Sequence, residues 1–267
     1  YGGFGNLAAN TGNLSAQFYG GTAGIDVQVT PDTLIGVGGL YGQNQLGVSY
    51  ASMAATQDVG GAGFYGITRF GQAYLSGASY IGGDRANVTR SFGGFGTANG
   101  VLAGTVVAGR VEAGYTIPLG MFQVTPLVVF EPAGRWQGNS TEKVNYYGFQ
   151  EPGLTYNAQL TRSMPLIGGA QLDTDIKIPD GSVIMTFLRA GFVHEFNTNR
   201  ELTKSLSAFP DTQFTTGGNY AVPNAAIVRA GAQHKISEHV SLFAYTSSLL
   251  SQRYQTLGGN AGLMVHW

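Results

Sequence analysis

Polar and apolar side chains alternate along most of the chain, and residues 101–117 show the pattern best. The odd-numbered positions there are uncharged and mostly apolar, whereas the even-numbered positions include Arg110, Glu112 and Gly114. A period of two residues places successive side chains on opposite faces of a β-strand. The pattern therefore predicts a strand with one apolar face and one face that carries charge.

The next segment, residues 122–137, repeats this arrangement, with Glu131 and Arg135 on the face opposite Val124 and Val128. Pro118-Leu119-Gly120 lies between the two segments, and Pro and Gly are residues that tight turns favour. Together the two segments predict a long antiparallel hairpin.

The same reading predicts twelve strands in all. Their ranges are 2–10, 15–29, 34–49, 59–70, 73–89, 101–117, 122–137, 155–177, 182–197, 224–236, 240–251 and 256–267. Each can reach the roughly 9 to 11 residues that a tilted strand needs to cross a bilayer.

The connections between these strands fall into two kinds. Short turns are expected near residues 31, 71, 119, 180 and 238, and longer polar loops at 50–58, 90–100, 138–153 and 198–223. Short turns at one end and long loops at the other are typical of a transmembrane β-barrel, and closure satisfies the backbone polar groups in lipid. The fold class expected is all-β, an antiparallel up-and-down transmembrane barrel of 12 strands that forms one domain over residues 1–267.

Composition agrees with a surface that faces lipid. Charged residues make up 11% of the 267, against roughly 25% in soluble domains, and the net charge of −1 argues against a nucleic-acid partner. The absence of Cys rules out disulfides and thiolate metal sites. The chain has no run of about 18 apolar residues, so a membrane-spanning helix is not predicted. Because the chain starts at Tyr1 rather than Met, we expect a processed product or an excised domain.

Several motifs occur in an order that resembles one known family. They are Arg110-Val111-Glu112-Ala113-Gly114-Tyr115 followed by Val124-Thr125-Pro126, the strand end His194-Glu195-Phe196, and the early pair Gly24-Ile25-Asp26 and Leu34-Ile35-Gly36. Over essentially its whole length the chain resembles the translocator β-domain of bacterial type V autotransporters.

The last segment adds to the resemblance. Asn260, Gly262, Val265 and the terminal aromatic Trp267 look like the signal that the barrel assembly machinery reads in such proteins. The resemblance implies an outer-membrane protein that exports and anchors its own N-terminal passenger. The partners implied are outer-membrane lipid, the assembly machinery and the passenger polypeptide, and the barrel is expected to be a monomer.

No catalytic, cofactor-binding or metal-binding residues are expected. Residues 61–66 match G-x-G-x-x-G, but no helix pattern follows, so a nucleotide site is not predicted. The four histidines lack metal-ligand spacing, and no Ser, His and acid grouping indicates an enzyme. An outer-membrane porin for small solutes is the alternative that the same alternation permits.

Charged residues on the strand face opposite the apolar side chains are the candidate functional residues. In the lumen such residues avoid the cost of roughly 2 to 4 kcal/mol that Arg or Lys has at the bilayer midplane. We expect them to brace the pore by Arg–carboxylate pairs and to line the passenger's path. They are Arg110, Glu112, Glu131, Arg135, Arg189, Glu195 and Arg229.

Overall fold

The computed structural model describes residues 2–10, 14–49, 52–147, 149–178, 182–216, 222–252 and 255–266. Apart from the short 3-10 helix η2 (Gly93–Phe95), its regular elements are strands. They are β1 (Gly2–Asn10), β2 (Leu14–Thr30), β3 (Thr33–Val48), β4 (Met53–Phe70), β5 (Ala73–Ser91), β6 (Gly96–Tyr115), β7 (Ile117–Leu119), β8 (Phe122–Phe130), β9 (Ala133–Gln137), β10 (Ser140–Tyr146), β11 (Phe149–Tyr156), β12 (Gln159–Ser163), β13 (Pro165–Lys177), β14 (Val183–Glu195), β15 (Leu202–Leu206), β16 (Phe209–Thr216), β17 (Asn224–Lys235), β18 (Val240–Leu250) and β19 (Gln255–Val265).

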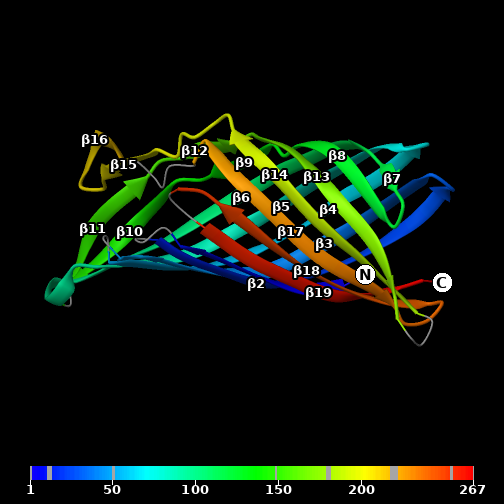
Figure 1. The fold of residues 1–267 in the computed structure, drawn as a ribbon. Coiled ribbons are helices and arrows are strands. Elements are labelled where there is room, and N and C mark those ends of the chain that lie inside the picture. Colours follow the sequence, from blue (N-terminus) through cyan, green and yellow to red (C-terminus); the bar gives the residue numbers. More distant parts are fainter. Residues whose placement is uncertain are drawn as a thin grey trace.

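These strands pair in a closed antiparallel ring, which confirms the predicted barrel (Figure 1). Consecutive pairings lead from β1 to β6, then through β8, β13, β14, β17 and β18 to β19. The ring closes because β1 also pairs with β19, with Gly5 opposite Asn260. Closure leaves no open sheet edge in the wall, as a membrane-spanning sheet requires.

The predicted count of 12 strands is not confirmed, since the described residues form 19 strands. One reason is that predicted strands are interrupted. The segment 122–137 is divided into β8 and β9 at Glu131 and Pro132, where the ring of Pro132 removes a backbone N–H donor. The other reason is that two predicted loops, 138–153 and 198–223, contain the strand pairs β10–β11 and β15–β16.

The predicted difference between the two ends of the barrel is confirmed only in part (Figure 1). The predicted loops 50–58 and 90–100 are largely strand, because β4 begins at Met53, β5 ends at Ser91 and β6 begins at Gly96. The chain termini and the tight turns lie at one end, and β10, β11, β15 and β16 lie at the other, which we call the loop end. The turn predicted at Pro118-Leu119-Gly120 is displaced, because residues up to Leu119 pair in β7 and the turn is made at Gly120 and Met121. Gly120 has a φ of 65°, a conformation that favours glycine. The turn predicted near residue 180 lies outside the described residues.

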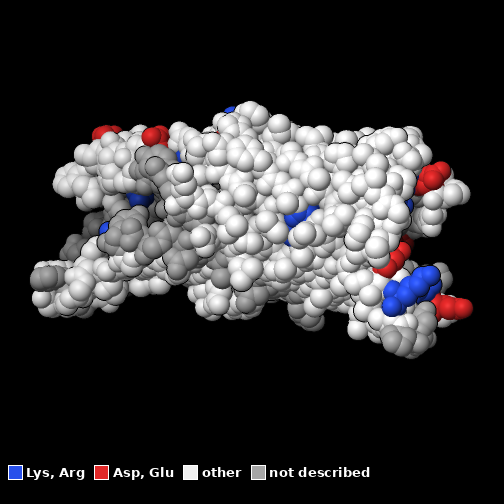
Figure 2. Space-filling view, viewed as in Figure 1, with Lys and Arg blue, Asp and Glu red and all other residues white. Residues whose placement is uncertain are grey.

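The outer face of the wall is apolar, and its exposed side chains keep the predicted parity. Ile25, Phe64, Ile81 and Val107 are 53%, 70%, 62% and 57% exposed, although they are large hydrophobic residues. On the face shown in Figure 2 the charged side chains gather toward the two ends, and the middle is nearly free of charge apart from one small basic area. In the part of the chain described, no helix is long and apolar enough to cross a membrane.

The inner face differs between two halves of the ring. One half, made by β8, β13, β14 and β17, has a buried apolar cluster of Leu127, Val129, Ile167, Val193, Ala225 and Ile227. The other half, β2 to β5, has small inward positions covered by aromatic rings that lie along the wall. A Cβ at Gly36 would overlap the ring of Tyr65, and one at Gly61 would come within 2.6 Å of the ring of Tyr80.

Candidate functional site: a polar network across the lumen

The centre of the candidate site is a pair of inward side chains on β6, Arg110 and Glu112. Because they are two residues apart on one strand, they point to the same face. That face is opposite Val107 and Val111, which are more than half exposed on the outer wall. The predicted placement of the charged face of this strand toward the lumen therefore agrees with the geometry.

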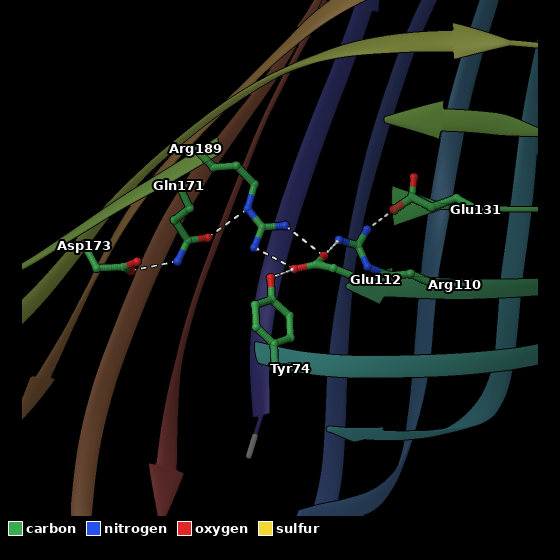
Figure 3. A network of polar contacts seen from close by, with 7 residues as sticks. All are labelled: Tyr74, Arg110, Glu112, Glu131, Gln171, Asp173 and Arg189. Carbon is green, nitrogen blue, oxygen red and sulfur yellow. Dashed lines mark hydrogen bonds and ion pairs between the residues drawn. The ribbon is translucent and has the colours of Figure 1, made fainter. Parts of the chain in front are cut away.

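Glu112 accepts hydrogen bonds from three different side chains (Figure 3). Nη1 and Nη2 of Arg189 donate to Oε2 and Oε1 of Glu112 at 2.9 and 3.0 Å. The hydroxyl of Tyr74 donates to Oε1 at 2.6 Å, and Arg110 pairs with Oε2. The carboxylate is only 5% exposed, so these donors supply the hydrogen bonds that water would otherwise provide.

The contact between Arg189 and Glu112 passes over two strands of the wall. Arg189 is on β14 and Glu112 on β6, and the ring places β13 and β8 between them. The Arg189 Nε also donates to Gln171 Oε1 at 2.8 Å, which fixes the guanidinium group from the opposite side. A salt bridge between residues 77 apart in sequence thus bridges part of the lumen.

The network continues at both ends. Arg110 pairs with Glu131, which lies between β8 and β9, and the Gln171 amide donates to Asp173 at 2.7 Å. Figure 3 shows the seven side chains as one connected series inside the barrel. We call this set, Tyr74, Arg110, Glu112, Glu131, Gln171, Asp173 and Arg189, the lumen network.

The lumen network lies against the apolar cluster without leaving much space. The cavity bounded by Arg110, Arg189 and Arg229 and by Leu127, Val129, Ile167 and Ile227 holds about 10 Å³, close to the minimum that one water molecule needs. The arginines of the lumen therefore pack closely against the apolar cluster at this point.

Arg229 is near the network but makes no hydrogen bond or ion pair with another described residue. It lies on β17 directly opposite Arg189 in the β14–β17 register. Like charges in that position repel each other. The ion pairs of this part of the lumen join Arg110 and Arg189 to the network carboxylates Glu112 and Glu131, and Arg229 lies beside them.

Two of the predicted lumen residues belong to separate clusters. Arg135 makes a bidentate pair with Asp84 of β5, with Nε and Nη2 at 2.8 and 2.6 Å from the carboxylate oxygens. Glu195 ends β14 and accepts from the backbone N–H groups of Met164 and Asn197 at 2.7 and 2.9 Å. Glu195 thus holds the chain where β12 ends, β13 begins and β14 ends. The structure does not join it to the lumen network.

A further buried carboxylate, Glu142, anchors the hairpins of the loop end. It is 2% exposed and accepts from Arg90 at 2.6 Å and from the Tyr156 hydroxyl at 2.7 Å. The ammonium group of Lys204 lies 5.1 Å from the ring centre of Tyr156. Burial lowers the pKa of Lys204, an effect that the nearby Glu142 opposes, and burial together with the hydrogen bond to Glu142 raises the pKa of Tyr156.

Sequence reasoning missed Tyr74, Asp84, Gln171, Asp173 and Glu142. Asp84 could have been found, because it is an acidic residue within the predicted strand 73–89, the same signal that identified Glu112. Glu142 fell in a predicted loop, and Tyr74 and Gln171 are uncharged, so alternation alone gave no reason to select them.

The predicted assembly signal lies on the last strand. Asn260, Gly262 and Val265 belong to β19, which pairs with both β18 and β1. Trp267 lies outside the described residues. Within the described ranges no three His, Asp or Glu side chains form a group that could hold a metal ion.

Three solved structures share this fold. The translocator domain of the autotransporter NalP from Neisseria meningitidis is 16% identical, with a TM-score of 0.80 over 100% of this chain and 87% of that one. The β-domain of the Bordetella autotransporter BrkA is 13% identical with a TM-score of 0.67, over 100% of this chain and 98% of that one. The transport unit of AIDA-I from Escherichia coli is 13% identical with a TM-score of 0.66, over 100% and 89%.

The sequence itself matches the model of one protein family. No curated protein matches the chain, but the family model described as Autotransporter beta-domain matches residues 1–247. The match covers most of the closed ring and all seven residues of the lumen network. The chain therefore belongs to the autotransporter β-domain family.

Proposed function

We propose that this barrel exports its own N-terminal passenger across the outer membrane and anchors it there, and that the lumen network sets the path. The observation that carries the proposal is the closed barrel of an autotransporter β-domain whose inner face has two unlike halves. One half carries the apolar cluster and most of the lumen network, and the other has glycines against which tyrosine rings lie.

The path we propose runs along β2 to β5. There the inward positions include Gly36, Gly61, Gly82 and Ala78, and the rings of Tyr65 and Tyr80 lie against the glycines instead of extending into the lumen. Ala78 is exposed on the inner face, so space lies in front of it. An extended passenger segment would pass along this wall.

The lumen network has a mechanical part in this proposal. Because Arg189 reaches over β13 and β8 to Glu112, it connects β5, β6, β13 and β14 by charged hydrogen bonds. Such bonds are stronger than neutral ones, and they keep the wall from collapsing onto the path. No catalytic step is part of this proposal, and the barrel acts as a monomer that the assembly machinery inserts by reading β19.

A diffusion porin is the alternative, and the geometry favours it less. A porin needs a water-filled lumen, whereas here the lumen network packs closely against an apolar cluster on the inner face. Single-channel conductance of the purified barrel separates the two, because the proposal expects a small conductance and a porin a large one.

The direct test fuses a protease-sensitive reporter segment ahead of residue 1 and expresses the fusion in a Gram-negative host. Protease added to intact cells should cut the reporter. Ala78→Trp, which narrows the proposed path, should reduce the surface-exposed fraction several-fold, whereas Ser79→Trp, on the adjacent outward position, should not. Equal export by both variants would contradict the path, and a periplasmic reporter beside a correctly folded barrel would contradict export itself.

A further inference from the structure

The outer wall of β2 to β6 contains a groove that the export function does not use. The groove has a volume of about 630 Å³, within the usual range for ligand sites. Its floor consists of small side chains, Ala23, Gly39, Ala62 and Ser79, and its walls of larger ones, Ile25, Val37, Phe64, Ile81 and Val107. The register explains the shape, because Ala23, Gly39 and Ala62 follow one another across three neighbouring strands.

A polar row crosses the same strands on the loop-end side of the groove. Tyr19, Gln43, Asp58 and Arg85 are paired in register from β2 to β5, and all four face outward. Gln43 bonds to Tyr19 and donates to Asp58 Oδ1 at 3.0 Å. Arg or Lys costs about 0 to 1 kcal/mol near the interface, but more at the midplane, so the row marks where the apolar band ends.

Arg85 is the cation of this row, and it is available for a ligand. Its side chain is exposed, and it forms no hydrogen bond or ion pair with another described residue. Below it toward the groove, the outward positions on β5 and β4 are Gly83 and Gly60, which pair with one another, and the ring of Tyr41 on β3 lies beside Gly60. A planar guanidinium group with unused donors suits a phosphate.

We propose that this surface binds one phosphate-bearing, multi-chain glycolipid of the outer leaflet, with an acyl chain in the groove and a phosphate on Arg85. An acyl chain alone would gain little, because the lipid it leaves is equally apolar. Specificity for this lipid must therefore come from Arg85 and from the fit of an acyl chain to the small residues of the groove floor. The polar row lies at the outer leaflet when the loop end faces the cell exterior, and this orientation rests on the proposed function. Lipid binding itself does not depend on export.

The test titrates the purified, folded barrel with bisphosphorylated lipid A and counts bound lipid by native mass spectrometry. Arg85→Gln should weaken binding about fivefold, which is the effect expected of one cation at an anionic surface. Ala62→Phe should weaken it at least as much by filling the floor. Asp58→Asn should strengthen it, because it removes the negative charge opposite Arg85.

Matched controls are available on the other walls. Arg162→Gln, on the exposed face of β12, and Ala244→Phe, on the exposed face of β18, should leave binding unchanged. Fully dephosphorylated lipid A should bind no better to the wild type than to Arg85→Gln. The proposal is overturned if the groove variants bind like the controls, or if phosphatidylglycerol binds as tightly as lipid A.

Discussion

Glu112 shows at the scale of one residue how a charge is kept inside a membrane barrel. Three side chains donate to a carboxylate that is almost fully buried, and two of the donors carry charge. Removing one partner of a buried ion pair leaves the other charges uncompensated. The stability lost in this way is larger than the net stability that the intact pair contributes.

Replacing Glu112 by Gln should therefore destabilise the barrel by about 3 kcal/mol, because Arg189 and Arg110 then lack their shared anion. The measurement is urea unfolding of the barrel in liposomes. Asp173→Asn is the matched control: it changes a carboxylate at the end of the same network, which accepts from Gln171, and should cost about 1 kcal/mol or less. Equal losses in the two variants would show that Glu112 is not the centre of the network.

A second residue-scale prediction compares a glycine of the inner face with a glycine of the outer face. Gly36→Val should cost about 2 kcal/mol, since its Cβ would overlap the Tyr65 ring and lie 2.8 Å from the Asp26 Cβ. Gly168→Val, on the outer face of β13, should be neutral or favourable, because nothing lies within 4 Å of a Cβ there. The same unfolding measurement checks both, and a costly Gly168→Val would contradict the assignment.

At the scale of the elements, the hairpins of the loop end depend on Glu142. This carboxylate joins β10 to Arg90 of β5 and Tyr156 of β11, while β15 pairs with the end of β11. The wall strands do not need it for their own pairing. The hairpins should therefore be able to unfold while the wall stays folded.

Glu142→Gln should loosen the β10–β11 and β15–β16 hairpins without unfolding the wall. Limited proteolysis of the folded protein should cut the variant several times faster within residues 140–156 and 202–216, while its heat-modifiable mobility stays that of the wild type. Glu195→Gln, which removes the charge that strengthens the backbone hydrogen bonds at the end of β14, provides a comparison at the same end of the barrel. A variant that loses the folded band altogether would show that Glu142 supports the wall as well.

Alternation could predict the strands and their faces because lipid and lumen sort side chains strictly. Residues 101–117 illustrate this, since Val107 and Val111 face outward and Arg110 and Glu112 inward. The break at Pro132 and the hairpins of the loop end escaped prediction, because parity carries no information about pairing partners. The contact of Arg189 with Glu112 could not be predicted either, as it depends on how the ring brings β14 toward β6.

At the scale of the whole molecule, closure is the property on which every other assignment depends. It rests on the pairing of β1 with β19, from Gly2 opposite Leu263 to Asn10 opposite Gln255. Directly opposite residues in an antiparallel pair have Cα atoms about 4.5 to 5.5 Å apart, which suits a disulfide. The natural chain has no Cys, so two introduced thiols have no competitors.

The variant Gly5→Cys with Asn260→Cys should form an intramolecular disulfide in the folded barrel. Boiled without reductant, it should migrate differently from the reduced chain. Gly5→Cys with Thr246→Cys, a pair not joined in the ring, should not cross-link. If the second pair formed a cross-link and the first did not, the barrel would not close by pairing β1 with β19.

The most direct measurement of the central claim is the gel mobility of the unboiled protein in detergent or liposomes, paired with circular dichroism. A closed membrane barrel predicts a β-rich spectrum and a compact band that shifts on boiling. A water-soluble, β-rich protein whose band does not shift would contradict the barrel, and with it the lumen network, the export path and the lipid site.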